Sequence, residues 1–468
     1  MKIHAPNIHL LAFQLYKASN LDTTLLQDND KNYLWQSADK IAIQTLQKQD
    51  LHLTQHIDIN KEADSPRVDL LKESEVKDGD YSLPFAGKIS LDDTQQVVIE
   101  GFAHPLRIHD SYGLWFNLRR PEEEDNKPTE DVDISLLSKL NLNNCFTLEK
   151  NELFLGQTLL ITGWLTSARD KQNVNTIAAE CLKHLFYKND KLPPLNRQGE
   201  LFGSPIFEYG LFSQLANYQH MLIWLFSDQK ADKNLQQCAQ ELFDLFFFRT
   251  KIVKAFTDSR KIYENLRDAY KKIDKLTNQL IKLDNSKAVA TNLTELENEL
   301  QKLPNLFLQY SRWLHDLEYN QNTIAIHQSN YSKKLEQISS IMPSENLDFL
   351  KSFSDKNVPY FKEQIEADLG YFRHGARALE QAISSIRGIV EIVQAESDRS
   401  LEKTIQIVGV GLGGGAIVSG VVTQHIDKPF APISFNNPFH PMVSSLFWSI
   451  LATFFFGALA LFCWTKQK

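Results

Sequence analysis

The sequence predicts an α+β (or α/β) cytoplasmic domain, then a long antiparallel helical arm, then a stalk helix that continues into a C-terminal two-helix transmembrane hairpin. Three observations lead to this fold class. Short apolar runs typical of strands fill the first half of the 468-residue chain. Apolar residues at helical spacing follow, from about residue 234. Two uncharged apolar segments come last, at 405–423 and 443–464, and the second is long enough to span a bilayer.

Residues 1–230 are expected to form the α/β-type domain. Runs rich in apolar, β-branched and aromatic residues predict strands, and helical spacing of apolar residues predicts helices. The predicted strands are 7–15, 96–99, 112–118, 158–164, 206–209 and 220–225. The predicted helices are 30–49, 134–140 and 176–186. The acidic, proline-interrupted stretch 121–131 is expected to be a solvated loop, with cation binding as the alternative.

The helical arm is expected over residues 231–358. Its first helix is predicted at 234–283, and the polar run 284–286 ends it. The second helix is predicted at 294–341, because Thr294 and Glu297 have the spacing of a capping box. Pro304 is expected to kink this helix. Two consecutive long helices with a short break between them predict an antiparallel pair.

The stalk, residues 359–404, has the strongest periodicity in the chain. Apolar residues alternate spacings of four and three, which is the heptad pattern of a coiled coil. The seam residues are Ile365, Leu369, Phe372, Ala376, Leu379, Ile383, Ile386, Val390 and Val393. Self-association through this seam is therefore expected, and the helix is predicted to run on without a break to Thr423.

Beyond the stalk the same phase reaches small and polar residues. They are Ser397, Ser400, Thr404, Ile407, Gly411, Gly414 and Val418. If the helix bundles around an axis, these residues line an aqueous pore; the alternative is that the serines lie on an ordinary surface. The glycines of 405–423 also have the G-x-x-x-G spacing of closely packed membrane helices.

The remaining segments complete the predicted hairpin. Residues 424–442 are expected to form a proline-rich outer loop, in which Asn436 and Asn437 either contact a cation or act as turn residues. Residues 443–464 are expected to face lipid, and 465–468 to form a cytoplasmic tail. The lysines that flank the two spans predict that both termini are cytoplasmic, which makes the chain a multi-pass protein of the cytoplasmic (inner) membrane.

Composition and motifs exclude several classes of function. The formal net charge of −8 gives no electrostatic basis for a nucleic-acid partner. The four cysteines lack the spacing of metal ligands or of a disulfide framework, and no signal peptide opens the chain. P-loop, G-x-S-x-G and H-E-x-x-H motifs are absent. We therefore expect no enzyme, no metal site and no cofactor, with a divalent cation as the one candidate.

Two groups of histidine and arginine residues remain as candidates without an assigned ligand. His52 and His56 are four residues apart, although two partly exposed histidines explain this spacing better than a shared site. A basic group near a predicted hairpin fits either a phosphate-bearing ligand or ordinary surface charge. Its members are His104, Arg107, His109, Arg119 and Arg120.

The order of these parts resembles the CorA family of bacterial cation channels. The resemblance covers 234–468 in architecture and is closest locally from 437–442 through the second span to the tail Thr465-Lys466-Gln467-Lys468. It implies a homopentamer in which the first span lines the pore. The Gly-Met-Asn motif that ends this span in the family is absent, because the corresponding stretch reads Val421-Val422-Thr423-Gln424-His425-Ile426.

The resemblance implies an oligomeric membrane channel or transporter for cations, gated by its cytoplasmic domain. The missing motif leaves an alternative, a membrane effector of a bacterial defence system that is gated by a nucleotide signal, for which a small nucleotide is the candidate ligand. A second alternative is a membrane-tethered coiled-coil scaffold without a pore. The expected partners are the membrane and further copies of this chain.

Overall fold

The computed structural model describes residues 1–16, 32–46, 51–61, 65–91, 95–167, 173–187, 191–282 and 293–396. The chain divides into two compact units. The first unit comprises Met1–Thr257 and Asn322–Lys362. The second comprises Asp258–Gln321 and the residues from Glu363 onward. Three long helices contribute residues to both units, because each of them crosses a boundary between these ranges.

Strands dominate the first unit. Their bounds are β1 (Lys2–Leu15), β2 (Arg67–Asp69), β3 (Leu83–Ser90), β4 (Gln96–Ile108), β5 (Ser111–Arg119), β6 (Glu123–Glu124), β7 (Lys127–Pro128), β8 (Val132–Asp133), β9 (Phe154–Trp164), β10 (Leu195–Leu201), β11 (Ser204–Tyr209) and β12 (His220–Phe226). The six strands predicted from the sequence are confirmed as parts of β1, β4, β5, β9, β11 and β12.

Helices follow the strands in the chain and also interrupt them. Their bounds are α2 (Tyr33–Leu46), α3 (Leu53–His56), α4 (Leu136–Leu140), α6 (Val174–Leu185), α7 (Gln229–Gln237), α8 (Ala239–Lys282), α10 (Leu293–Ile341), α11 (Asp348–Ser352) and α12 (Val358–Glu396). Short turns are η2 (Glu73–Glu75), η3 (Leu142–Asn144), η4 (Phe212–Asn217) and η5 (Phe353–Asn357). The three helices predicted in the first domain and the two long helices of the arm are confirmed.

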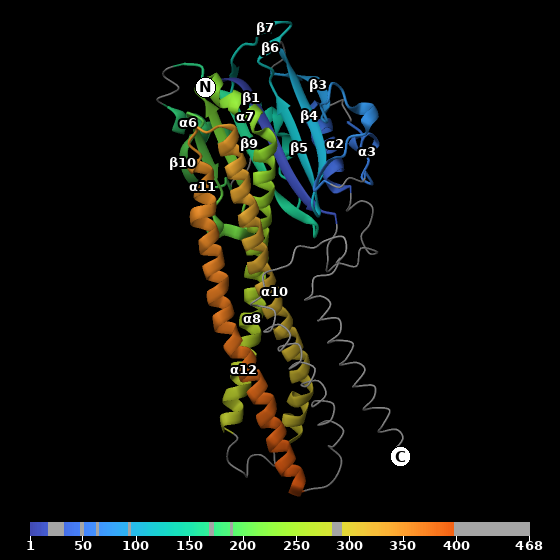
Figure 1. The fold of residues 1–468 in the computed structure, drawn as a ribbon, viewed down its shortest axis with the longest axis vertical. Coiled ribbons are helices and arrows are strands. Elements are labelled where there is room, and N and C mark those ends of the chain that lie inside the picture. Colours follow the sequence, from blue (N-terminus) through green and yellow to red (C-terminus); the bar gives the residue numbers. More distant parts are fainter. Residues whose placement is uncertain are drawn as a thin grey trace. The chain divides into compact units, whose positions relative to one another are not determined.

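Among the described residues, ten strands form one sheet (Figure 1). Its order is β10-β11-β12-β9-β1-β5-β4-β2, while β3 also pairs with β4 and β8 with the start of β1. The pairs along this order are antiparallel except for β12 and β9, which run parallel. This mixed sheet with long helices after it makes the fold α+β.

Both faces of the sheet are buried, as the alternation of side chains along β1 shows. Ile8, Leu10 and Ala12 belong to a core that includes side chains of α2, α4 and α6. Phe13 lies on the other face, where its ring centre is 5.1 Å from that of Phe243 in α8. Because successive strand residues point to opposite faces, β1 presents one set of residues to that core and the other set to α8.

Each of the three long helices buries one residue in every seven, which is the repeat of a coiled coil. These residues are Ile252, Ser259, Leu266 and Ile273 in α8, Leu303, Tyr310, Leu317, Ile324, Tyr331 and Ile338 in α10, and Val358, Ile365, Phe372, Leu379 and Ile386 in α12, and none is more than 1% exposed. The seam predicted in α12 is therefore confirmed as far as Ile386, and α8 and α10 share its seven-residue period.

In the second unit, the three helices meet at Gly375 of α12. A Cβ atom on this residue would overlap Tyr310 Oη of α10 and lie 2.6 Å from Tyr270 Cδ2 of α8. Tyr310 Oη also donates a hydrogen bond to the carbonyl of Phe372, at 2.8 Å. Only a residue without a side chain leaves room for both tyrosines.

The predicted stalk seam is occupied by the chain's own helices. Ile365, Phe372 and Leu379 are fully buried, and Phe372 has ring contacts with Tyr263 and Tyr270 of α8. As far as Ile386, this seam is therefore not free to receive another copy of the chain. Self-association through this part of the seam is therefore not supported, and the homopentamer that the CorA resemblance implies stays a prediction.

The prediction of a transmembrane hairpin is corrected by the structure. Within the described ranges, no helix is both long enough and apolar enough to cross a membrane. The physical reason is that α8, α10 and α12 carry charged residues along their length, so that none of them contains an uncharged apolar stretch long enough to span a bilayer. The fold is an α+β sheet with long helices, and the predicted channel and multi-pass location in the cytoplasmic membrane are not supported.

The residues to which the hairpin was assigned lie outside the described part of the chain. This applies to both predicted spans, 405–423 and 443–464, to the loop 424–442 and to the tail 465–468. It also applies to the predicted pore and loop residues Ser397, Ser400, Thr404, Ile407, Gly411, Gly414, Val418, Asn436 and Asn437.

Candidate functional site

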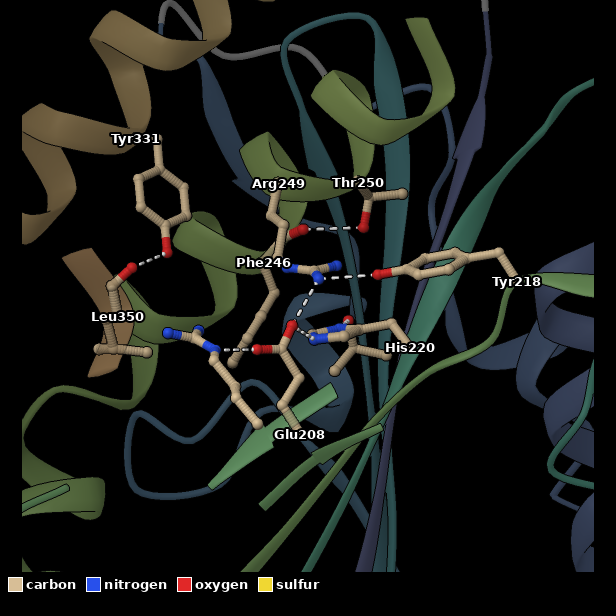
Figure 2. A network of polar contacts seen from close by, with 10 residues as sticks. Glu208, Tyr218, His220, Phe246, Arg249, Thr250, Tyr331 and Leu350 are labelled. Atoms are coloured by element: carbon tan, nitrogen blue, oxygen red, sulfur yellow. Dashed lines mark hydrogen bonds and ion pairs between the residues drawn. The ribbon is translucent and has the colours of Figure 1, made fainter. Parts of the chain in front are cut away.

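Glu208 is a charged residue inside the apolar strand β11. Its neighbours Phe207 and Tyr209 belong to the core on the side of α2 and α6. Strand alternation therefore turns Glu208 toward the face that α8 covers. The residue is only 2% exposed, and a buried carboxylate is tolerated only when it is paired. Figure 2 shows the side chains that surround it.

Three basic side chains from three elements contact the Glu208 carboxylate. Arg249 of α8 donates from Nη2 to Oε1 at 2.8 Å. Arg197 of β10 donates from Nε to Oε2. His220 of β12 has its Nε2 atom 3.3 Å from Oε1. One carboxylate thus ties α8 to three neighbouring strands of the sheet, β10, β11 and β12.

Further contacts extend the network on both sides. Arg249 Nη2 also donates to Tyr218 Oη at 2.7 Å. Thr158 of β9 has its Oγ1 atom 2.8 Å from His220 Nδ1. We name these residues the Glu208 network: Thr158, Arg197, Glu208, Tyr218, His220 and Arg249.

Arg249 also contacts the helical turn η5, from which α12 starts. Its guanidinium carbon lies 4.7 Å from the ring centre of Phe353. This turn is a π-helix, in which the Val358 amide bonds to the Phe353 carbonyl. Pro359 follows at once, and a proline ring inside a regular helix would clash with the carbonyl four residues earlier, so a wider turn accommodates it. Arg249, which is itself part of α8, therefore lies close to the point at which α12 begins.

The electrostatics of the network fix its protonation states. Burial alone would raise the pKa of Glu208, but the hydrogen bond from His220 and the arginine charges hold this pKa far below its usual range. Burial and the charge of Arg249 lower the pKa of His220 to about 4. The imidazole is therefore neutral at pH 7, with Nε2–H donating to Glu208 and Nδ1 accepting from the Thr158 hydroxyl.

Thr158, His220 and Glu208 form a hydroxyl–imidazole–carboxylate series like that of a catalytic triad. Thr158 is 0% exposed and His220 only 4% exposed. The hydroxyl lies in the middle of a central strand under α8, where no substrate can reach it. The imidazole nitrogens are also exchanged relative to the serine hydrolases, since Nδ1 faces the hydroxyl. The series can hold the sheet and α8 together, but it cannot act as a nucleophilic site.

The basic group predicted near a hairpin does not form one site. The hairpin itself is confirmed, with His109 and Asp110 as the turn between β4 and β5. Arg119 lies at the other end of the nine-residue strand β5, where it pairs with Glu100 at 3.1 Å. The turn and the arginine are therefore separated by the length of the strand.

The other members of the basic group also have partners within the protein. His104 Nε2 lies 2.7 Å from the Asp69 carboxylate. Arg107 donates to the carbonyl of Lys61 at 3.0 Å. Arg120 pairs with Glu124 at 3.0 Å. Because each of these three side chains contacts a different neighbour, ordinary structural charge explains this group.

The two remaining sequence candidates are also resolved. His52 precedes α3 with a left-handed backbone, whereas His56 ends α3 and pairs with Glu75 at 3.2 Å, so they do not share a helical face. The acidic stretch forms a small hairpin, β6 and β7, instead of a loop. Its turn residues Asp125 and Asn126 both have positive φ, as a tight hairpin turn requires. Among the described residues, no group of His, Cys, Asp and Glu has the arrangement of a metal site.

Sequence reasoning missed the Glu208 network, although three of its four strands, β9, β11 and β12, were predicted. The available signal was a single charge inside an apolar run, as in Phe207-Glu208-Tyr209 and Phe248-Arg249-Thr250. A lone charge at such a position has to find an opposite charge when it is buried. The pairing itself was not readable, because it depends on the order of the strands.

Comparison with known proteins finds no relative. No protein-family model matches the chain, and neither a curated protein nor a solved structure matches it. The resemblance to the CorA family therefore stays a prediction from the sequence. Function has to be inferred from the geometry of the described residues.

Proposed function

We propose that this protein is a non-enzymatic coupling scaffold. The sheet of the first unit anchors the long helices, and the helices carry its conformational state into the coiled coil of the second unit. In this role the protein acts through a change of helix packing, and no chemical step takes place on it.

The Glu208 network is the observation that supports this proposal. Its carboxylate, imidazole and guanidinium groups are all engaged with one another and are buried. They therefore serve to fix α8 on the sheet. The same helix continues without interruption from Ala239 to Lys282, and its residues from Asp258 onward belong to the second unit. A continuous helix is a rigid element that can transmit a change from one end to the other.

Hydrogen exchange on the whole chain tests the coupling. Arg249→Met removes the charge of the anchor but keeps the length of the side chain. If α8 couples the units, this variant raises exchange of the α8 amides between Asp258 and Lys282, although the substituted residue belongs to the first unit. The measurement is native-state exchange at neutral pH, resolved by peptide.

The control is a substitution outside α8 that destabilises the protein about as much as Arg249→Met does. Leu137 of α4 lies in the core on the opposite face of the sheet and is 0% exposed. Truncation of such a residue to alanine costs about 2–5 kcal/mol, in the same range as the loss of Arg249. If Leu137→Ala raises exchange in the second half of α8 as much as Arg249→Met does, general destabilisation explains the result and the coupling proposal is wrong.

A further inference from the structure

A second charged cluster lies in the first unit, where the β4–β5 turn meets α8 and α10. The ring of His109, in the turn, has its centre 6.5 Å from that of Phe247 and 6.1 Å from that of Phe248, both in α8. The ring of His327 in α10 is stacked on the same Phe248 at 5.8 Å. Two histidines from separate elements thus share one phenylalanine of α8.

Charged side chains of the turn, α8 and α10 act on these histidines. Lys251 of α8 donates to both carboxylate oxygens of Asp110 at 2.7 Å. Asp244 of α8 pairs with Lys334 of α10 at 2.9 Å and also with Arg67 of β2. Three cations therefore face two carboxylates, which leaves one excess positive charge while both histidines are neutral.

This environment disfavours a protonated histidine. Burial lowers the pKa of His327 to about 4, and the charge of Lys251 adds to the effect. Burial also lowers the pKa of His109, although the carboxylates of Asp110 and Asp244 oppose this shift. If both imidazoles took up a proton, the excess would rise from one positive charge to three around the partly buried His327 and the exposed turn residues His109 and Asp110.

We propose that His109 and His327, together with Arg67, Asp110, Asp244, Lys251 and Lys334, form an acid-sensitive latch. With neutral histidines the latch holds α10 and the β4–β5 turn on α8, and with protonated histidines it opens. The inference goes beyond the coupling function and does not depend on it, because it concerns only the contact of α10 with α8 and the turn.

The direction of the effect follows from proton linkage. A histidine whose pKa is lower in the folded protein than in the unfolded chain contributes stability above about pH 6.5 and loses it as the pH falls toward the folded value. For His327 alone, a fall from about 6.5 to about 4 shifts the equilibrium toward the open state by about 30-fold between pH 7.5 and pH 5.0.

The test compares the full-length protein with variants that cannot titrate at the latch. His327→Phe keeps a flat ring on Phe248, and His109→Gln keeps a polar side chain in the turn. The readout is hydrogen exchange of the α10 amides from Asn322 to Ile341 at pH 7.5 and 5.0, corrected for the intrinsic rates. We expect an increase of about 30-fold in the wild type and a change of less than about threefold in the double variant.

Two controls make the result specific to the latch. His374 is an exposed residue of α12, and His374→Gln is expected to retain the full acid response of the wild type. Imidazole NMR of the wild type gives the titration of His327 directly and does not depend on any variant folding. The latch is refuted if His327 titrates near 6.5, or if the double variant opens with acid as much as the wild type does.

Discussion

The two units of this protein bury polar groups in different ways. The first unit encloses full charges, since Glu208 and Arg249 are 2% and 3% exposed. The second unit is built on a seam that repeats every seven residues, and the polar groups buried in this seam are the hydroxyls of Ser259 and Tyr310. The second unit also buries the carboxylate of Asp368, at 6% exposed, but the arginine that pairs with it, Arg260, stays partly exposed.

The two units also differ in the contacts that select one packing of their helices over the alternatives. A seam with a strict seven-residue period fits nearly as well after a slip of seven residues, so an irregular contact has to set the register. Gly375 with its two tyrosines is such a contact. In the first unit, the pairing of buried charges excludes a misplaced α8, because it would leave Glu208 unpaired.

The largest effect is expected from Arg249→Met. The variant leaves the Glu208 carboxylate buried with one arginine in place of two, and removal of one partner from a buried ion pair costs about 3–5 kcal/mol. Urea unfolding at pH 7 measures the loss. Arg387→Ala is the control, because Arg387 pairs with Glu391 on the surface of α12, where such pairs contribute about 0.3–0.5 kcal/mol. If the two variants lose the same free energy of unfolding, the Glu208 network does not anchor α8 to the sheet.

The next effect is expected from Gly375→Ala. The added methyl group would overlap Tyr310 Oη and press on Tyr270, and overpacking of this kind costs about 1–3 kcal/mol. Gly370→Ala, five residues earlier in the same helix, meets no atom within 4 Å. This control is expected to stabilise the protein by about 0.5–1 kcal/mol, because alanine favours the helix. If both alanines stabilise the protein, Gly375 does not set the register.

Much of this fold was readable from local patterns. The strands β1, β4, β5, β9, β11 and β12 and the three long helices follow from apolar runs and helical spacing. The seam from Ile365 to Ile386 was also identified by its period. What it packs against was not, because a heptad pattern is the same whether the partner is another copy or the chain's own helices.

Contacts between distant residues account for what the sequence did not reveal. Glu208 and Arg249 are 41 residues apart, and they meet only because the Glu208 side chain points to the face of the sheet that α8 covers. The two short strands β6 and β7 were predicted as a loop, because prolines and acidic residues are depleted in strands. The membrane hairpin was inferred from apolar length alone, and no described helix bears it out.

A smaller effect is expected from Thr158→Val, which removes the buried hydroxyl group that bonds to His220. Valine has the shape of threonine but leaves His220 Nδ1 without its donor, at a cost of about 1–2 kcal/mol. Thermal unfolding measures this loss, and Thr158→Ser is the matched control that keeps the hydroxyl. If valine and serine behave alike, the hydrogen bond to His220 contributes nothing and the network ends at His220.

The smallest effect is expected from Tyr310→Phe in the second unit. The hydroxyl donates to the carbonyl of Phe372, and loss of one neutral hydrogen bond costs about 0.5–1.5 kcal/mol. The ring stays in place, so the contact with Gly375 and the seven-residue seam are retained. Urea unfolding of this variant is set against that of Arg249→Met. A loss as large as that of the arginine variant would mean that the helical unit also depends on a buried polar anchor, and the contrast between the two units would disappear.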